Sequence, residues 1–184
     1  LCLLGEIRLE KEKTLLQAQD HFMSVDPIMT KLVSLYGDVS LRQRNASFEA
    51  LMRIIVSQQI SEKAATTIFN RVAALYTSLP IIPEYILKTS YENLRGCGLS
   101  NSKTKYIFNI AEVFTKDPNF LSNLKESESE NAYNSLLNIK GIGDWTANIF
   151  LMFYLGDQNI FPYGDTSLIK AVHLLYDENI NRRK

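Results

Sequence analysis

The spacing of apolar residues is helical almost throughout this chain of 184 residues. No stretch shows the alternation of apolar and polar residues, bounded by turns, that is typical of a half-buried strand. Instead, capping residues precede apolar stripes at Ser24 or Asp26, Ser47, Ser61 and Ser100. We therefore predict an all-α fold, a bundle of about nine or ten short helices, and the length fits one large domain or two small lobes. Residues 1–184 are expected to form a single domain, and the absence of an initial Met leaves open that it is a fragment.

Composition excludes several classes of protein. Charged residues make up 22% of the chain, and nine Tyr, nine Phe and one Trp exclude a disordered chain. No apolar run approaches the ~20 residues that span a bilayer, and the first residues lack a secretory signal, so we expect an intracellular protein, nuclear or cytoplasmic. The 20 basic and 20 acidic residues give no net charge, so a nucleic-acid function must rest on local features.

The two cysteines, Cys2 and Cys97, exclude a disulfide framework and a four-cysteine metal site. An iron–sulfur cluster held by four cysteines is excluded for the same reason. We therefore expect no metal ion bound by this pattern of residues.

Two glycines flank an isoleucine at Gly141-Ile142-Gly143, between two apolar helical segments. The amides of such a turn and of the following helix start lack intrahelical acceptors, and together they can bind a phosphate. Lys140 adds a positive charge, and Ile142 would fill the gap between the helices. The plainer interpretation is a helix end followed by a new helix start. The residues predicted to contact a nucleic-acid backbone are Lys140, Gly141, Ile142, Gly143, Asp144 and Thr146.

A carboxylate, Asp165, follows the turn Phe161-Pro162-Tyr163-Gly164. By itself Asp165 is an ordinary helix N-cap, because Asp is a preferred capping residue. A cap position is compatible with a chemical role, since it would hold the carboxylate rigidly in its ionised form.

The Gly-Ile-Gly turn, then Trp145-Thr146-Ala147-Asn148, then the segment 161–165 resemble the helix-hairpin-helix DNA glycosylase superfamily. The closest branch is the 3-methyladenine DNA glycosylase II type. Three further segments resemble that branch in the same order, namely residues 24–27, 48–65 and 94–107. The resemblance implies a helix-hairpin-helix motif and an active cleft between the two lobes.

In this superfamily an aspartate at the position of Asp165 is the catalytic carboxylate. Breaking an N-glycosidic bond builds positive charge on the sugar, which a fixed carboxylate stabilises while it orients or deprotonates the attacking water. Bifunctional members carry a nucleophilic lysine where this chain has Trp145. Because tryptophan cannot form a Schiff base, the resemblance implies a monofunctional glycosylase that leaves an abasic site.

Trp145 and Tyr163 are the candidates for the walls of a base pocket. Alkylated purines are cationic, and aromatic faces attract them by stacking and cation–π contact. The alternative for Trp145 is a core tryptophan at a helix start. A further aromatic residue of the bacterial type is replaced by Ile149, which leaves base selectivity open.

Relatives push a side chain into the gap left by the extruded base, from the loop that corresponds to Gln58-Gln59-Ile60. Gln59 is the first candidate for this wedge and Ile60 the second. Alternatively, Gln58 and Gln59 are solvent-exposed residues at a helix end. A small basic surface around Lys140, with Lys63 and Lys103 as further candidates, would give DNA binding a shallow salt dependence.

The expected function is hydrolytic excision of alkylated bases, such as 3-methyladenine, from double-stranded DNA in base excision repair. Three alternatives remain: a glycosylase for another lesion such as uracil, a catalytically silent module that binds the DNA backbone, and a helical protein-interaction domain. We expect a monomer with no membrane association and no cofactor, apart from a monovalent cation that hairpin carbonyls could hold.

Overall fold

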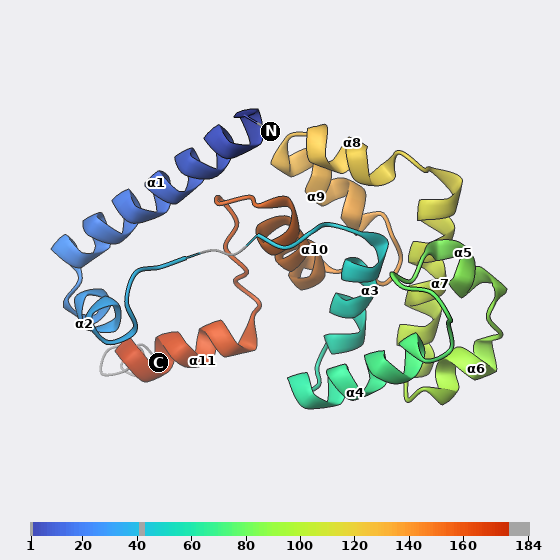
Figure 1. The fold of residues 1–184 in the computed structure, drawn as a ribbon. Helices are drawn as coiled ribbons and strands as arrows, with labels where there is room; N and C mark the ends of the chain where they lie inside the picture. Colours follow the sequence, from blue (N-terminus) through green and yellow to red (C-terminus); the bar gives the residue numbers. More distant parts are fainter. Residues whose placement is uncertain (1, 41–42, 177–184) are drawn as a thin grey trace. The chain divides into compact units, whose positions relative to one another are not determined.

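The computed structural model describes the backbone of residues 2–40 and 43–176, and the side chains of residues 13–40 and 43–176. This part of the chain forms eleven α-helices and one π-helical turn, without a strand (Figure 1). The all-α prediction is confirmed, with one or two helices more than expected. None of the described helices is long and apolar enough to cross a membrane.

The chain divides into two compact units, one comprising Leu1–Arg42 with Thr166–Lys184 and the other Gln43–Asp165. The predicted single domain with a cleft between two lobes stays a prediction. The first unit contains α1 (Cys2–Val25), α2 (Pro27–Tyr36) and α11 (Thr166–Tyr176).

Asp26 holds the first unit together at the start of α2. Its Oδ1 accepts hydrogen bonds from the amides of Ile28 and Met29, which is the expected N-cap arrangement. Its Oδ2 accepts the hydroxyl of Tyr176 in α11 at 2.6 Å. The carboxylate therefore links residues at opposite ends of the chain.

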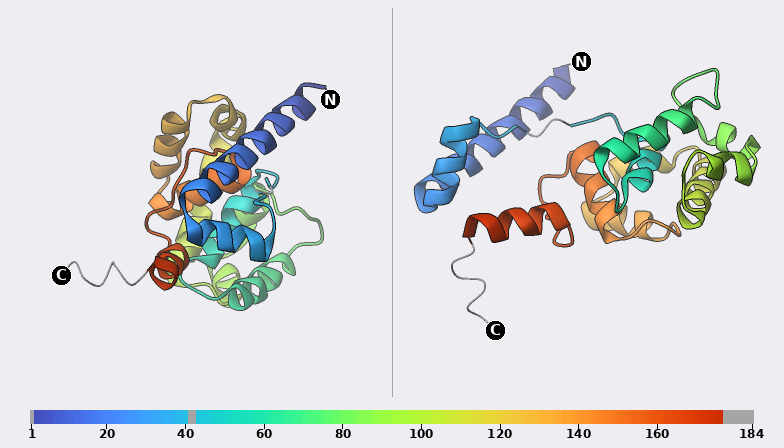
Figure 2. Two further views of the ribbon diagram at one scale, coloured as in Figure 1. Left: turned by 90° about the vertical axis from the view of Figure 1, so that its left-hand side faces the viewer. Right: turned by 90° about the horizontal axis from the view of Figure 1, so that it is seen from below.

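The Gln43–Asp165 unit holds the remaining helices, gathered around a common centre rather than in layers (Figure 2). Its core consists of fully buried aliphatic and aromatic side chains such as Leu51, Ile55, Ile107 and Phe150. The elements are α3 (Phe48–Ser57), α4 (Glu62–Ala73), α5 (Pro83–Lys88), α6 (Tyr91–Gly96), α7 (Asn101–Lys116), α8 (Phe120–Glu126), α9 (Ser129–Leu137), α10 (Asp144–Phe150) and the π-helical turn η1 (Leu151–Leu155).

Serine caps start several of these helices, as predicted. The side chains of Ser47, Ser61 and Ser100 each accept the backbone amide three residues further on. Each cap satisfies one of the amides that a helix start leaves without an intrahelical partner.

The polar run 125–130 contains a short break between two helices, since α8 ends at Glu126 and α9 starts at Ser129. The apolar segment after the hairpin is helical, as predicted, but it widens into a π-helical turn after Phe150. The turn ends where the amide of left-handed Gly156 donates to the carbonyl of Leu151.

Candidate active site

The turn between α9 and α10 is a tight hairpin built on Gly141. The amide of Ile142 donates to the carbonyl of Ile139 at 3.0 Å, and the φ angle of Gly141 is +111°. A Cβ atom at Gly141 would lie 2.2 Å from Cγ of Tyr106, so this position has room for glycine only. Ile142 is buried between the helices, where it was expected to fill the gap.

Gly143 differs from Gly141, because a Cβ atom there would meet no atom within 4 Å. Gly143 precedes the first turn of α10, and no side chain caps that turn. The first backbone hydrogen bond of the helix runs from the Ala147 amide to the Gly143 carbonyl. The amides of Asp144, Trp145 and Thr146 therefore have no intrahelical acceptor, and Gly143, just before them, borders open space.

The side chains around the hairpin are not equally accessible. Lys140 is exposed. The carboxylate of Asp144 accepts the hydroxyl of Tyr133 at 2.7 Å, and this hydrogen bond raises the pKa of Tyr133. Thr146 is only 1% exposed as a whole residue, and its hydroxyl accepts a hydrogen bond from Gln58, so it offers almost no surface to another molecule.

Trp145 and Asp165 lie in direct contact, although the sequence separates them. The indole Nε1 donates to Oδ2 of Asp165 at 2.7 Å. The amide of Asp165 also donates to the carbonyl of Pro162, which closes the turn before it. Both side chains are half-buried, so a neutral donor fixes one oxygen of the carboxylate in a partly desolvated place.

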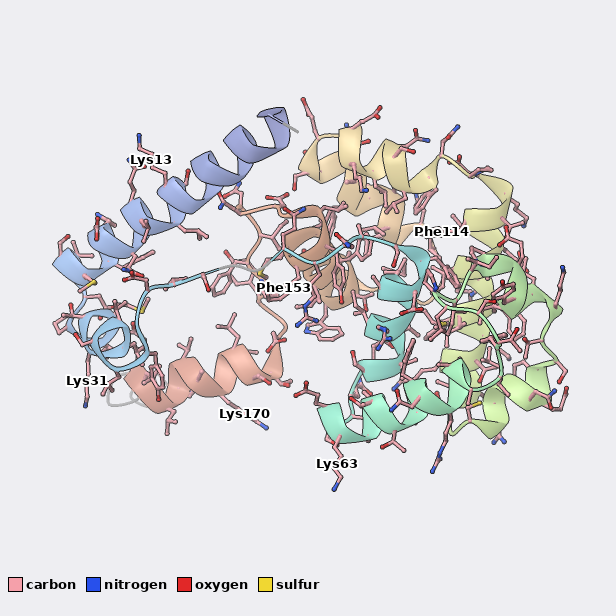
Figure 3. All side chains as sticks on the ribbon, in the orientation of Figure 1. Lys13, Lys31, Lys63, Phe114, Phe153 and Lys170 are labelled. Carbon is pink, nitrogen blue, oxygen red and sulfur yellow. The ribbon has the colours of Figure 1, made fainter. Side chains whose placement is uncertain are left out.

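A cavity of about 450 Å³ lies beside Trp145 within the Gln43–Asp165 unit. Its apolar lining comes from α3, α4, α10, the π-helical turn and the loop before α4: Ile54, Ile60, Ala65, Phe69, Trp145, Ile149, Phe153 and Tyr154. Polar side chains contribute the rest of the lining: Arg44, Arg53, Ser57, Glu62 and Thr66. Figure 3 labels Phe153 in this region.

The charged residues of the lining differ in their partners. Arg53 forms an ion pair with Glu49 at 3.0 Å, and its guanidinium lies 3.4 Å from the centroid of the Phe69 ring. Glu62 has no hydrogen-bond or ion-pair partner among the described side chains. Arg53 and Glu62 were not among the predicted site residues, because only the packing of α3 against α4 places them around one cavity.

Tyr163 does not line the cavity. Its side chain is 80% exposed and packs edge-to-face against Phe161, with the ring centroids 4.8 Å apart. Of the two aromatic residues predicted for a base pocket, the structure brings only Trp145 to the cavity.

The three wedge candidates take different positions in the loop between α3 and α4. Gln58 turns inward, and its Nε2 donates to Oγ1 of Thr146 at 2.9 Å and to the Gly141 carbonyl at 3.4 Å. Gln59 is exposed, with a positive φ of 55°. Ile60 is half-exposed and lines the cavity.

The basic residues considered for phosphate binding differ in their exposure and in their contacts. Lys63 is exposed on α4 (Figure 3), and Lys140 is exposed at the hairpin. Lys103 instead donates to the carbonyls of Val56 at 2.8 Å and Gln58 at 2.7 Å. Its partial burial lowers the pKa of the ammonium group. Lys103 therefore binds backbone carbonyls of the protein and does not contribute to the basic surface for which it was considered.

Known proteins resemble the chain over most of its length. Residues 52–183 match the model of the HhH-GPD superfamily base excision DNA repair proteins. DNA-3-methyladenine glycosylase 1 of Schizosaccharomyces pombe is 30% identical over 177 residues, which cover 91% of this chain and 77% of that protein.

Two solved structures extend this likeness to the fold. The S. pombe 3-methyladenine DNA glycosylase Mag1 in complex with abasic DNA superposes with a TM-score of 0.76 at 29% identity, covering 88% of this chain and 81% of that chain. The DNA-3-methyladenine glycosidase of Bacillus halodurans has a TM-score of 0.71 at 32% identity, covering 85% and 72%.

Proposed function

Since the chain belongs to the HhH-GPD superfamily of base excision DNA repair proteins, we propose that it is a DNA glycosylase acting on alkylated bases such as 3-methyladenine. One observation carries the proposal: Trp145 lines the cavity and also donates a hydrogen bond to Asp165. Trp145 therefore connects the cavity, which can hold an extruded base, with the Asp165 carboxylate, which can act on the sugar. Such an enzyme acts in the compartment that holds DNA, as a monomer on double-stranded DNA with a damaged base.

The reaction breaks the bond between C1′ of the sugar and the base nitrogen. The electron pair of this bond leaves with the base, so a cationic alkylated purine departs as a neutral molecule. Positive charge develops on the sugar, and the Asp165 carboxylate stabilises it. Water then adds to C1′ and gives its proton to Asp165, which leaves an abasic site. The indole Nε1 of Trp145 keeps the carboxylate oriented during these steps.

The cavity would take the base after it leaves the stack. Rings of Trp145, Phe153 and Tyr154 provide aromatic surface for a cationic purine. The Phe69 ring is already in contact with the Arg53 guanidinium. The carboxylate of Glu62 adds a favourable charge, whereas Arg53 is already paired with Glu49.

The proposed enzyme has no lyase activity. Strand cleavage by this class of enzyme requires an amine that attacks the sugar, and Trp145 stands at the corresponding position. No lysine is found among the described residues that line the cavity. Incubation with damaged DNA and borohydride should therefore trap no covalent complex; a trapped complex would contradict this part of the proposal.

The hairpin and the loop 58–60 would hold the DNA. The amides at the start of α10, with Lys140, provide a site for a backbone phosphate. Gln59 is the exposed wedge candidate, and Ile60 borders the cavity. Catalysis needs no organic cofactor. A monovalent cation at the hairpin would share a backbone whose Lys140 and Gly141 carbonyls already accept hydrogen bonds from Asn109 and Gln58.

The test is release of 3-methyladenine from methylated DNA under single-turnover conditions by the wild-type chain and by Asp165→Asn. We expect the substitution to slow release by about 100-fold or more, because a fixed catalytic carboxylate is lost. Affinity for a duplex with an abasic-site analogue should stay within about threefold. Unchanged release would remove Asp165 from this role, and binding without release from any lesion would favour a silent DNA-binding module.

A further inference from the structure

Three side chains on one face of α7 reach the backbone of both loops proposed to contact DNA. Lys103, Tyr106 and Asn109 are spaced by three residues, so they lie on the same side of the helix. Lys103 contacts the end of α3, whereas Tyr106 and Asn109 contact the hairpin. Tyr106 and Asn109 were not among the predicted site residues, and Lys103 was considered only for a basic surface that binds phosphate.

Lys103 holds the backbone where α3 ends and the loop to α4 begins. Its ammonium donates to the carbonyls of Val56 and Gln58, at the end of a helix where carbonyls lack intrahelical partners. A positive charge at this end is also favoured by the helix dipole. The next residue, Gln59, has a positive φ that only a few non-glycine residues adopt. Lys103 therefore fixes the backbone just before the exposed wedge candidate.

Asn109 and Tyr106 support the hairpin in the same way. Nδ2 of Asn109 donates to the Lys140 carbonyl at 2.8 Å. The ring of Tyr106 fills the space that a side chain at Gly141 would need. The hairpin thus lies directly on α7, within two helical turns of Lys103.

Gln58 joins the two loops directly. Its backbone carbonyl accepts from Lys103, while its side chain donates to Thr146 in α10 and to the Gly141 carbonyl. The loop 58–60, the hairpin and α7 therefore each contact the other two. Movement of the loop relative to the hairpin would break at least one of these hydrogen bonds.

We propose that Lys103 is a positioning residue that sets the loop 58–60 at a fixed distance from the hairpin for extrusion of the damaged base. The inference rests on the proposed function. Extrusion requires a side chain to enter the base stack at a defined distance from the bound phosphate. Lys103 touches neither base nor sugar and acts only through the backbone of Gln58.

The test compares Lys103→Met with Lys103→Arg, which keeps a charged donor, and with Lys105→Met, a control at an exposed position of the same helix. Excision is measured under single-turnover conditions on two duplexes with the same lesion. One pairs the lesion normally, and the other places it opposite an abasic-site analogue, so that little extrusion work remains.

We expect Lys103→Met to slow excision from the paired duplex by about tenfold or more, because two charge-assisted hydrogen bonds are lost. On the unpaired lesion it should stay within about threefold of wild type. Lys103→Arg should recover most of the rate on the paired duplex, and Lys105→Met should match wild type on both.

An equal loss on the two duplexes, or no loss on either, would overturn the proposal. Thermal unfolding of each variant checks that it folds. If Lys103→Met does not fold, Lys103→Gln, which keeps one donor, replaces it under the same criteria. Failure of the wild-type chain to release base from either duplex would instead contradict the proposed function itself.

Discussion

Trp145 joins the cavity to the carboxylate, and these two contributions can be separated. Trp145→Phe keeps an aromatic ring beside the cavity but removes the Nε1 donor that lies 2.7 Å from Asp165. We expect single-turnover excision to slow by about 10- to 100-fold, because a hydrogen bond to a charged group is lost. Affinity for abasic-site DNA should change little.

Trp145→Leu is the companion variant, because it removes both the donor and the ring. It should slow excision further than Trp145→Phe does. Equal rates for Trp145→Phe and the wild type would show that the indole donor does not matter for Asp165.

At the scale of residues, the positions that belong to a local sequence motif could be predicted. The positions that depend on the packing of distant helices could not. Trp145 and Asp165 follow recognisable turns, and the structure places them in contact. The contact of Lys103 with Val56 joins residues 47 positions apart. Nothing in the sequence around Lys103 distinguishes it from an exposed lysine, since only the packing of α7 beneath α3 creates the contact.

Among the elements, the hairpin offers a matched pair of glycines. Gly141→Ala adds a methyl group where the Tyr106 ring already lies, at a positive φ. We expect it to lower the free energy of unfolding by about 3 kcal/mol or more. Gly143→Ala should change it by no more than about 0.5 kcal/mol, because open space surrounds that position.

Denaturant titration of the two variants measures this difference. Gly143→Ala should still fold yet bind DNA more weakly, since its methyl group would stand where a phosphate approaches the amides. Equal destabilisation by both substitutions would contradict the described hairpin geometry.

The cap of α2 predicts a pH dependence in the first unit. The hydrogen bond from Tyr176, with those from the Met29 and Ile28 amides, holds the pKa of Asp26 below its ordinary value of 3.8. The ionised carboxylate therefore stabilises the fold above that value, and this contribution is lost as pH falls through the lower, folded-state pKa.

Thermal unfolding followed by far-UV circular dichroism from about pH 5 to about pH 2 tests this dependence. The melting temperature of the wild-type chain should fall more steeply with acid than that of Asp26→Asn, which cannot ionise. Parallel curves for the two proteins would exclude a contribution from Asp26.

For the elements, the sequence predicted where helices start better than where they end. The serine caps mark helix starts locally, and each was found where it was expected. The π-helical turn after Phe150 carries no such signal. Leu151 and Tyr154 are buried there, and the rings of Phe150 and Tyr154 stack on each other.

At the scale of the whole molecule, the absence of net charge limits how the protein can hold DNA. Lys63 and Lys140 are the exposed basic candidates that remain once Lys103 is assigned to the α3 carbonyls. We expect a plot of log affinity against log salt concentration to have a slope of about −2 to −3. Fluorescence anisotropy with an abasic-site duplex over a salt series measures it.

Lys140→Ala should make the slope shallower by about one unit. A wild-type slope of about −6 or steeper would require a broad basic surface and would contradict this account.

The π-helical turn also has a consequence for how the cavity could change. A π-helical turn accommodates one residue more than an α-helical turn, and each residue of an α-helix advances by about 100° around its axis. Deleting Met152, which precedes both aromatic residues, would let the segment continue as an ordinary helix with its backbone hydrogen bonds intact. Phe153 and Tyr154 would then each take the helical position of the residue before it and leave the space that they border. Chain length at this point, as much as side-chain identity, can therefore alter which bases fit.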